Sequence, residues 1–400
     1  MTKKHAEWTS VENRVAVLTD RRRRKMARSA HAYVRGSTAK FYEWLEEAPV
    51  TIPDGPPIWI CGDCHIGNLG PIASAKGEVQ IGIRDLDQTV IGNPAHDLIR
   101  LGLSLASAGR GSDLPGVLTT RMLEGLIEGY ETAFGDGERE NGYGMPGAVQ
   151  AAVDSALRRQ WKQLANDRVD GQAGIPLGKK FWPLSKEERQ AIFDLFEEDK
   201  VRRLVTVLRS RDDEARVEVL DAAFWVKGCS SLGNVRYAAL VRVGGTEGEL
   251  CLMDIKEAVT PVTPRDRSAK MPRDNSLRVA EGAWHLSPAL GDRLRPAKLL
   301  RHSVFLRELM PQDLKFEIEH LTSEEAVSVA HYLGIVVGKA HARQMDPETQ
   351  RRWQAELRRN RTRTLDAPSW LWTSVVDLIM AHEGAYLEHC RRFAMSADAL

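Results

Sequence analysis

The sequence has few cysteines, no long apolar run and no excess of either charge. Five cysteines in 400 residues are an odd number and too few for a disulfide scaffold, so we expect free thiols in a reducing compartment. No apolar run approaches the roughly 18 residues of a membrane span, and no apolar stretch follows the N-terminal lysines, so we expect a cytoplasmic protein with no membrane partner. The 56 basic and 55 acidic residues nearly cancel, which gives no electrostatic reason to expect a nucleic-acid partner.

What remains is the composition of an ordinary globular protein, with 42% hydrophobic and 28% charged residues. Because typical domains have roughly 100–200 residues, a chain of this length predicts two lobes that can enclose a cleft. Helical periodicity dominates both ends of the chain, and alternating apolar residues predict an antiparallel sheet between them, at 217–220, 237–243 and 250–256 with a turn at 244–248. We therefore predict an α+β fold with a helical lobe over 1–209, a small β-rich lobe over 210–320 and returning helices over 321–400.

The N-terminal part predicts one long helix followed by a two-stranded ribbon. Apolar residues recur at helical spacing over 10–47, around the basic run Arg21–Lys25, which is typical of a solvated helix face. The apolar segments 58–61 and 79–83 predict two short strands that pair with each other. Polar residues follow each of these strands, so the ribbon brings two polar clusters into the same region.

The polar residues after the two strands have the chemistry that phosphoryl transfer needs. Transfer to a hydroxyl requires a carboxylate that orients or deprotonates the acceptor, oxygen ligands for Mg²⁺ and donors for the phosphates. Asp63 and Asn68 follow the first strand within one short loop, and Asp85 follows the second, so one cavity can receive all three side chains. In this interpretation Asp63 is catalytic, and Asn68 and Asp85 bind the metal.

The same residues carry a resemblance to known enzymes. Residues 61–68, Cys-Gly-Asp-Cys-His-Ile-Gly-Asn, resemble the His-Gly-Asp-Leu-His-Pro-Gly-Asn catalytic loop of aminoglycoside phosphotransferases and choline-kinase-like enzymes. Residues 83–98 resemble the Ile-Asp-Trp-Glu and Gly-Asp-Pro-Ala-Tyr-Asp-Leu-Ala stretch of those enzymes. The resemblance implies that Asp85 binds metal, that Asp87 is the acidic residue after it and a further candidate metal ligand, and that Asp97 braces the catalytic loop.

A second set of residues resembles the nucleotide-binding elements of kinases. Residues 227–237 resemble the glycine-rich loop that covers the phosphates of ATP, where small residues let backbone N–H groups approach closely. Lys256 matches the strand lysine that binds the α- and β-phosphates, and Glu281 on the next predicted helix matches its ion-pair partner. Residues 304–310 resemble the strand and hinge whose backbone reads adenine. The cofactor-binding candidates are Gly228, Ser230, Ser231, Gly233, Lys256, Glu281, Glu308 and Met310.

The order of these elements differs from that of ordinary kinases. Residues 333–343, near the C-terminus, match the helix that leads into the catalytic loop of kinases, whereas the catalytic loop itself lies near the N-terminus. Residues 25–393 as a whole resemble an uncharacterised bacterial family of circularly permuted, protein-kinase-like proteins, a domain of unknown function. The resemblance implies a bilobal fold with ATP and Mg²⁺ as cofactors. It also implies transfer of the γ-phosphate to a hydroxyl of a small-molecule substrate, such as an antibiotic or a metabolite.

Other interpretations of the same residues stay open. The phosphate acceptor could be a protein, the same fold could transfer an adenylyl group as a pseudokinase does, or the cleft could sense nucleotide without catalysis. Residues 61–65 also read as C-x-x-C-H, the attachment motif of c-type haem, and Cys61 with Cys64 as half of a zinc site. Haem attachment requires export and a closed zinc site requires two more ligands, so both are less well supported than the kinase-like interpretation.

Overall fold

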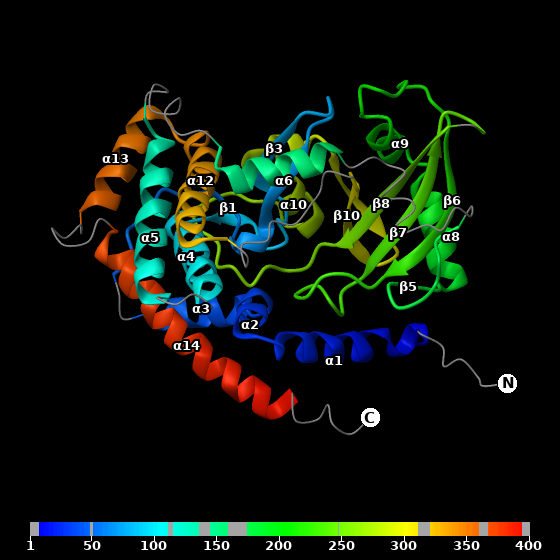
Figure 1. The fold of residues 1–400 in the computed structure, drawn as a ribbon. Coiled ribbons are helices and arrows are strands. Elements are labelled where there is room, and N and C mark those ends of the chain that lie inside the picture. Colours follow the sequence, from blue (N-terminus) through cyan, green and yellow to red (C-terminus); the bar gives the residue numbers. More distant parts are fainter. Residues whose placement is uncertain are drawn as a thin grey trace.

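The computed structural model describes residues 8–48, 51–110, 115–135, 145–158, 174–246, 248–310, 321–359 and 367–393. Most of its helices gather on one side of the molecule, and a six-stranded antiparallel sheet lies on the other (Figure 1). The predicted α+β class is confirmed. Among the described residues, no helix combines the length and the apolar character needed to cross a membrane.

The N-terminal segment forms several short elements rather than the one helix that we predicted over 10–47. Ser29 caps a new helix by accepting a hydrogen bond from the Ala32 N–H at 3.1 Å, and Ser37 has non-helical backbone angles. Apolar spacing missed both breaks, because a cap or a turn can interrupt a helix and leave its apolar periodicity nearly intact. The elements are η1 (Val11–Asn13), α1 (Arg14–Met26), α2 (Ala30–Gly36) and α3 (Thr38–Glu47).

Two short antiparallel ribbons follow, and their pairing shows that our ribbon prediction was wrong. The strand at 58–60 pairs with residues 90–92, and the strand at 79–83 pairs with residues 69–73, so the two predicted strands do not pair with each other. An apolar pattern identifies a strand but carries no information about its partner. The elements are β1 (Ile58–Ile60), η2 (Ile66–Asn68), β2 (Leu69–Ala73), β3 (Val79–Ile83) and β4 (Val90–Gly92).

The helical side is built around two helices that touch at glycines. Its helices are α4 (Ala95–Gly109), α5 (Pro115–Thr132), α6 (Gly147–Arg158), α12 (Ser323–Ala342), α13 (Pro347–Arg358) and α14 (Ser369–Phe393). A Cβ on Gly129 of α5 would lie 1.9 Å from the carbonyl oxygen of His331 in α12. A Cβ on Gly334 of α12 would lie 2.2 Å from the carbonyl oxygen of Leu126 in α5. Only glycine permits this approach, which brings the backbones of α5 and α12 into direct contact.

The sheet has the strand order β5-β6-β7-β8-β10-β9. It contains the three predicted strands, and β7 and β8 are joined by the predicted turn at 244–248. Glu247 of this turn lies outside the described residues. The strands are β5 (Phe181–Trp182), β6 (Val217–Trp225), β7 (Arg236–Val243), β8 (Glu249–Glu257), β9 (Leu294–Leu299) and β10 (His302–Glu308). The helices α10 (Asn275–Leu286) and α11 (Pro288–Gly291) lie between β8 and β9 in the chain.

The two faces of the sheet differ in polarity. Successive side chains of a strand point to opposite faces. One face packs into an apolar core with α8 (Lys186–Leu195) and α9 (Asp199–Val205). The segment 181–205, which we predicted within the helical lobe 1–209, therefore packs on the sheet. Alternate positions of β7, β8 and β10 place charged residues on the other face, which is turned toward the helices: Arg236, Asp254, Lys256 and Arg307.

Helix α1 runs beside the sheet and ends at the helical side (Figure 1). Near its start, Arg14 forms a buried ion pair with Glu188 of α8 at 2.6 Å. Near its end, Lys25 donates from Nζ to the carbonyl of Gly228 at 2.7 Å. Nε2 of His389 in α14 lies 2.8 Å from the carbonyl oxygen of Arg23. The basic run that we interpreted as a solvated face therefore also makes contacts with the rest of the chain.

Candidate active site

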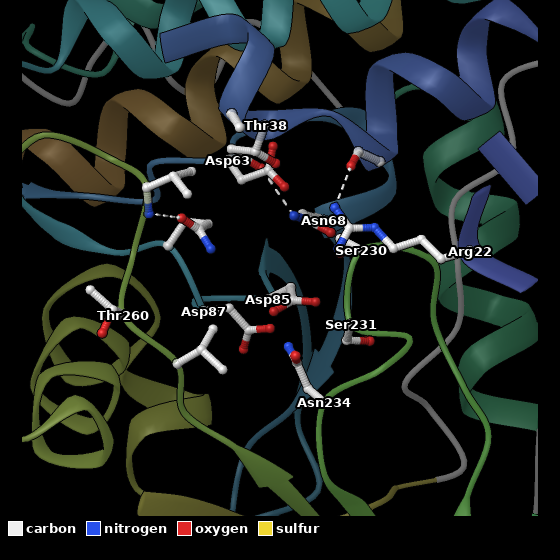
Figure 2. A pocket seen from close by; sticks show the side chains of 15 residues that line it. Arg22, Thr38, Asp63, Asn68, Asp85, Asp87, Ser230, Ser231, Asn234 and Thr260 are labelled. Atoms are coloured by element: carbon white, nitrogen blue, oxygen red, sulfur yellow. Dashed lines mark hydrogen bonds between the residues drawn. The ribbon is translucent and has the colours of Figure 1, made fainter. Parts of the chain in front are cut away.

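One pocket lies where several loops meet, and it contains the predicted catalytic residue and the predicted metal ligands (Figure 2). Its volume is about 210 Å³. The loop between β1 and η2 and the loop between β3 and β4 form one part of its wall, and the loop between β6 and β7 lies across from them. The labelled side chains in Figure 2 are Arg22, Thr38, Asp63, Asn68, Asp85, Asp87, Ser230, Ser231, Asn234 and Thr260.

Asp63 is held in place by a buried arginine. Nε of Arg100, on α4, donates to Oδ1 of Asp63 at 2.9 Å, and the arginine side chain has no exposed surface. Nε2 of His65 lies 3.8 Å from Oδ2. Asn68 donates from its amide nitrogen to the carbonyl of Asp63 at 3.0 Å, which fixes the turn between the two residues (Figure 2). Because Oδ1 is engaged by Arg100, Oδ2 is the oxygen of Asp63 that can accept a proton from a ligand.

Asp97 braces the backbone just before Asp63. Its Oδ2 accepts a hydrogen bond from the Cys61 N–H at 2.7 Å, and its Oδ1 accepts one from the Gly62 N–H at 2.9 Å. Gly62 has a φ of +74°, and a Cβ there would lie 2.3 Å from the carbonyl oxygen of Gln88. The turn therefore requires glycine at position 62 and a carboxylate at position 97.

A hydrogen-bonded chain connects Asp97 to three further helices. Nε2 of His341, at the end of α12, lies 3.2 Å from Oδ2 of Asp97. Nδ1 of the same ring lies 2.9 Å from the Tyr130 hydroxyl of α5, to which the Trp353 indole of α13 donates at 3.0 Å. Tyr130, Trp353, His341 and Asp97 are all buried. The position of the loop that carries Asp63 thus depends on α5, α12 and α13 as well as on α4.

Asp85 and Asp87 both form ion pairs with Lys256. Nζ of Lys256 is 3.1 Å from Oδ1 and 3.2 Å from Oδ2 of Asp85, and it also forms an ion pair with Asp87. Burial alone would raise the pKa of Asp85. The positive charge of Lys256 has the larger effect, so the pKa of Asp85 is well below its usual range. Burial and the charge of Asp85 raise the pKa of Asp87 to about 6. Oδ1 of Asp87 is buried and has no hydrogen-bond partner among the described residues.

Glu281 is not the partner of Lys256, which corrects our prediction. The position is exposed on α10, whereas Lys256 is buried against Asp85 and Asp87. The residue of α10 that reaches the acidic loop is Arg278, one helical turn earlier. Its Nη2 donates to the carbonyl of Asp87 at 3.0 Å, and the side chain is buried. Glu281 is on the exposed side of α10 with Leu277 and Trp284, whereas α10 packs through Val279, Gly282, Ala283 and Leu286.

The small residues between β6 and β7 have two different placements. Ser230 and Ser231 line the pocket opposite the carboxylates. Gly228 and Gly233 have φ angles of +98° and +106°, in the left-handed region that favours glycine. A Cβ on Gly233 would meet Thr19 of α1 at 3.3 Å. This loop therefore covers the pocket with its serines, while Gly233 faces α1.

The strand end that we predicted to read adenine is engaged elsewhere. The carboxylate of Glu308 is buried in an ion pair with Arg211 at 2.7 Å, and the carbonyl of Glu308 accepts from Nη2 of Arg293 at 2.9 Å. The Leu309 N–H donates to a backbone carbonyl of β8 at 2.8 Å. Met310 packs in a small apolar cluster. The structure therefore does not bring Glu308 or Met310 to the pocket.

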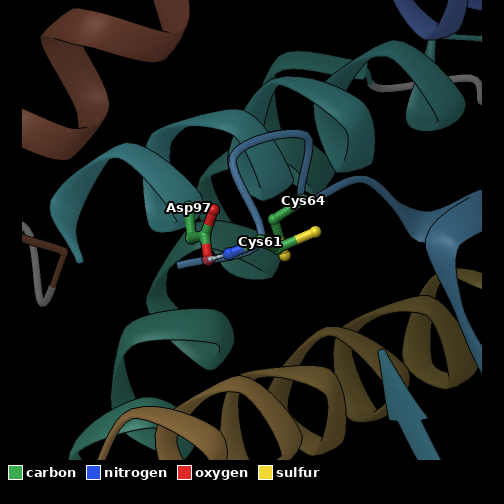
Figure 3. A group of neighbouring side chains, drawn as sticks. All are labelled: Cys61, Cys64 and Asp97. Carbon is green, nitrogen blue, oxygen red and sulfur yellow. Dashed lines mark hydrogen bonds between the residues drawn. The ribbon is translucent and has the colours of Figure 1, made fainter. Parts of the chain in front are cut away.

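Cys61 and Cys64 lie next to Asp97 in the interior (Figure 3). Their sulfur atoms and a carboxylate oxygen of Asp97 lie within 4.8 Å of one another. Contact with Cys64 and burial raise the pKa of Cys61 well above its usual value, which disfavours the thiolate that a metal requires. Both carboxylate oxygens of Asp97 already accept backbone hydrogen bonds. The geometry fits a structural turn better than the zinc half-site that we considered.

Comparison with known proteins gives a family for the chain. The model of a family named DUF2252, with the description "Uncharacterized protein conserved in bacteria", matches residues 14–392. The chain belongs to the DUF2252 family. No curated protein and no solved structure matches it. This match confirms the part of the resemblance that predicted an uncharacterised bacterial family.

Sequence analysis of this DUF2252 chain missed several residues of the site. Arg100 is the clearest example, and a signal for it was present. It follows Asp97 by three residues in an otherwise apolar stretch, so both side chains lie on one face of α4 and must find polar partners in the interior. Arg22, which lines the pocket, lies in a basic run that gave no indication of which charges face inward.

Buried histidines make the DUF2252 fold sensitive to acid. Burial lowers the pKa of His65 and of His96 to about 4, and that of His382 to about 3. Below the unfolded value of about 6.5, the unfolded chain binds protons that the folded chain does not, so the free energy of unfolding falls as the pH falls from about 6.5 to 4.

We expect the free energy of unfolding, measured by urea titration, to fall by about 2 kcal/mol for each such histidine between pH 7 and pH 5. A His96→Gln variant is expected to show a shallower dependence. Equal stability at both pH values in the wild-type protein would contradict the burial of these neutral rings.

Proposed function

We propose that the protein is a Mg²⁺-dependent phosphotransferase that transfers the γ-phosphate of ATP to a hydroxyl group of a small molecule. The observation that carries the proposal is the convergence of Asp63, Asn68, Asp85 and Lys256 on one site beneath the serine-containing loop between β6 and β7. These residues come from segments that are far apart in the sequence. A carboxylate for the acceptor, oxygens for a cation and a cation for phosphates are the parts that this reaction requires.

The donor set fits a hard divalent cation. Asp85 and Asp87 contribute carboxylate oxygens, and Oδ1 of Asp87 is buried without a hydrogen-bond partner among the described residues. Asn68 uses its amide nitrogen for the Asp63 carbonyl, so its amide oxygen is the atom that suits a cation. Mg²⁺ prefers such oxygen ligands, and when bound it neutralises charge on the phosphate oxygens. We assign Asn68, Asp85 and Asp87 to this role.

Asp63 acts on the acceptor in this proposal. As the acceptor oxygen attacks the γ-phosphorus, the hydroxyl proton passes to Oδ2 of Asp63, and the bond from that phosphorus to the bridging oxygen of ADP breaks. Arg100 keeps Asp63 oriented through its hydrogen bond to Oδ1, because it is a buried cation that needs a carboxylate partner. Lys256 forms ion pairs with both carboxylates that we assign to the metal, so its charge acts on the phosphates that the metal binds.

The proposal includes a bilobal, kinase-like arrangement in permuted order. The sheet with its charged inner face, together with the segment 181–205 that packs on it, corresponds to the nucleotide-binding lobe that we predicted over 210–320, and the remaining helices correspond to a catalytic lobe. The order of the elements supports it: the loop with Asp63 comes before the loop with the serines, and α12 reaches the catalytic loop from near the C-terminus through His341.

Lys256→Met tests the proposal. Removal of a preorganised charge at a reacting phosphate typically lowers kcat by roughly 10²–10³. We expect a loss of that size in ATP consumption, screened with a panel of hydroxylated metabolites and antibiotics. The variant also leaves Asp85 and Asp87 without their cation, so Mg²⁺ is expected to raise its melting temperature more than that of the wild-type protein. Lys186→Met, at an exposed position of α8, is the matched control and should behave as wild type.

Intact-mass measurement of the products separates the remaining alternatives. A phosphorylated protein in place of a phosphorylated small molecule identifies a protein kinase, and an adenylated product identifies adenylyl transfer. Binding of MgATP without any turnover identifies a nucleotide sensor. If the wild-type protein does not bind MgATP at millimolar concentration in a calorimetric titration, the proposal is wrong for all of these.

A further inference from the structure

One arginine of the basic run Arg21–Lys25 reaches the candidate active site. Arg22 lines the pocket that contains Asp63 (Figure 2), and no ion pair involves it among the residues that the structure describes. Its hydrogen bond, from Nη2 to the carbonyl of Gly36, is long at 3.4 Å. The other four side chains of the run contact the ring of Trp182, the ring of Phe393, the carboxylate of Asp20 and the carbonyl of Gly228. Arg22 is therefore the member of the run that is available to a ligand.

The carboxylates of the same pocket have cations of their own. Asp63 pairs with Arg100 at 2.9 Å, and the two carboxylates that we assign to Mg²⁺ share Lys256. The guanidinium group of Arg22 carries five N–H donors, most of which the described residues leave unused. Such a group on the wall of a pocket favours a ligand with a carboxylate or a phosphate, whose oxygens accept several of these donors at once.

The N-terminus of α3 opens onto the same pocket. Gly36, Thr38 and Ala39 all line it, and α3 is ten residues long. No side chain caps the first turn of this helix, so the N–H groups of Thr38 and Ala39 have no intrahelical acceptor. These N–H groups and the helix dipole favour negative charge at this end of the helix.

The side chain of Thr38 is an independent donor at the same place. Thr38 is 7% exposed and lines the pocket, and its hydroxyl has no hydrogen-bond partner among the described residues. Tyr42, one turn later on the same face of α3, donates from its hydroxyl to the carbonyl of Gly62 at 2.6 Å. The face of α3 that carries Thr38 is therefore the face that packs against the loop of Asp63. A hydroxyl in this position can donate to a ligand that Asp63 also contacts.

Arg100 holds this segment close to Asp63. Its Nε donates to Oδ1 of Asp63, and its Nη2 donates to the carbonyl of Val34 at 2.7 Å, near the end of α2. Ser37 alone separates α2 from α3. An acceptor whose hydroxyl lies at Asp63 can therefore place a second group against Thr38 and Arg22.

We infer that Arg22, the Thr38 hydroxyl and the N-terminus of α3 bind an anionic group of the acceptor, so that the substrate is a hydroxyl compound that also carries a carboxylate or a phosphate. The inference rests on the proposed function, because it names the substrate class of that reaction. Carboxylates and phosphates present the same kind of oxygen acceptor to these donors. Among hydroxylated compounds, the site favours acidic ones over neutral and cationic ones.

Calorimetric titration of the full chain in MgCl₂ tests the inference, with glycerol, glycerate and glycerol 3-phosphate as the probes. The three compounds share one compact carbon skeleton, which suits a pocket of about 210 Å³, and differ in their charged group. We expect at least one anionic probe to bind more tightly than glycerol, by roughly tenfold or more. Its affinity should persist when the non-hydrolysable ATP analogue adenylyl imidodiphosphate is bound, because the donor phosphates occupy a different part of the cleft.

Variants assign the anion to these residues. Arg22→Met is expected to weaken binding of the anionic probe roughly tenfold, and Thr38→Val to weaken it in the same direction, because each removes a donor to a charged group. Arg24→Met removes the same charge at an exposed position of α1 outside the pocket, so it is the matched control and should bind as wild type. In turnover assays, Arg22→Met should raise the KM of the acceptor and leave the KM of ATP unchanged. Thermal unfolding of each variant checks that it is folded.

The outcomes separate the inference from the proposed function. If MgATP binds but neither anionic probe binds more tightly than glycerol, the inference is wrong and the proposed function stands. Displacement of the anionic probe by the ATP analogue would assign Arg22 to the donor phosphates and would also overturn the inference. Equal weakening by Arg22→Met and Arg24→Met would show nonspecific charge attraction, with the same consequence. Absence of MgATP binding removes the proposed function and the inference together. Binding of glycerate alone, or of glycerol 3-phosphate alone, supports the inference and identifies the anionic group.

Discussion

Asp63→Asn is expected to lower the turnover of phosphoryl transfer by roughly 10²–10⁴, because an amide cannot take the proton of the acceptor hydroxyl. The melting temperature should fall less than in Asp63→Ala, since an asparagine oxygen can still accept the hydrogen bond from Nε of Arg100, although the charge that balances the buried arginine is lost. Turnover of ATP with the preferred acceptor, measured alongside thermal unfolding, checks both parts of this expectation.

The choice of asparagine matters for the interpretation. Asp63→Ala would leave Arg100 as a buried cation without its partner, and breaking a buried pair in this way typically costs about 3–5 kcal/mol. A loss of activity in that variant could then reflect unfolding. Asp213→Asn is the matched control, because Asp213 is an exposed aspartate outside the site. Wild-type turnover in Asp63→Asn would show that Asp63 is not the acceptor's base.

Asp97→Ala is expected to have the largest effect on stability. It removes the acceptor for the N–H groups of Cys61 and Gly62, both of which are buried. Each hydrogen bond to a charged group contributes about 1.5–3 kcal/mol, so we expect the free energy of unfolding to fall by about 3–6 kcal/mol in urea titration at pH 7.

The conservative variant Asp97→Asn separates the effect of the hydrogen bonds from the effect of the side-chain volume. Asp97→Asn keeps the volume and one acceptor oxygen but presents an amide NH₂ group to the second N–H. Its loss of stability should therefore be intermediate. An Asp97→Ala protein that unfolds at the wild-type urea concentration would show that these two hydrogen bonds do not hold the catalytic loop.

The loops of the site were predictable from the sequence because their chemistry is local. The spacing of Asp63 and Asn68 within one turn, and the position of Asp85 after a strand, predicted that these residues lie together, and the structure places them in one pocket. Likewise, alternating apolar residues in the 217–256 region predicted strands, and the turn at 244–248 predicted that the last two of them pair with each other.

The sequence does not predict which distant segments contact each other. The partner of the strand at 58–60 lies 30 residues further on, and apolar periodicity is the same for either pairing. Glu281 was assigned by analogy to a helix face, but the orientation of α10 is set by its packing, which turns Arg278 inward.

The contacts of α1 couple the C-terminal helix to the loop that covers the site. The carbonyl groups of Arg23 and Ala27, at the end of α1, are held by His389 and Tyr386 of α14, and Lys25 between them holds the carbonyl of Gly228. Helix α1 therefore contacts both the C-terminal helix α14 and the glycine-bearing loop, so a substitution that removes the contact of His389 or Tyr386 with α1 acts on the helix that also holds this loop.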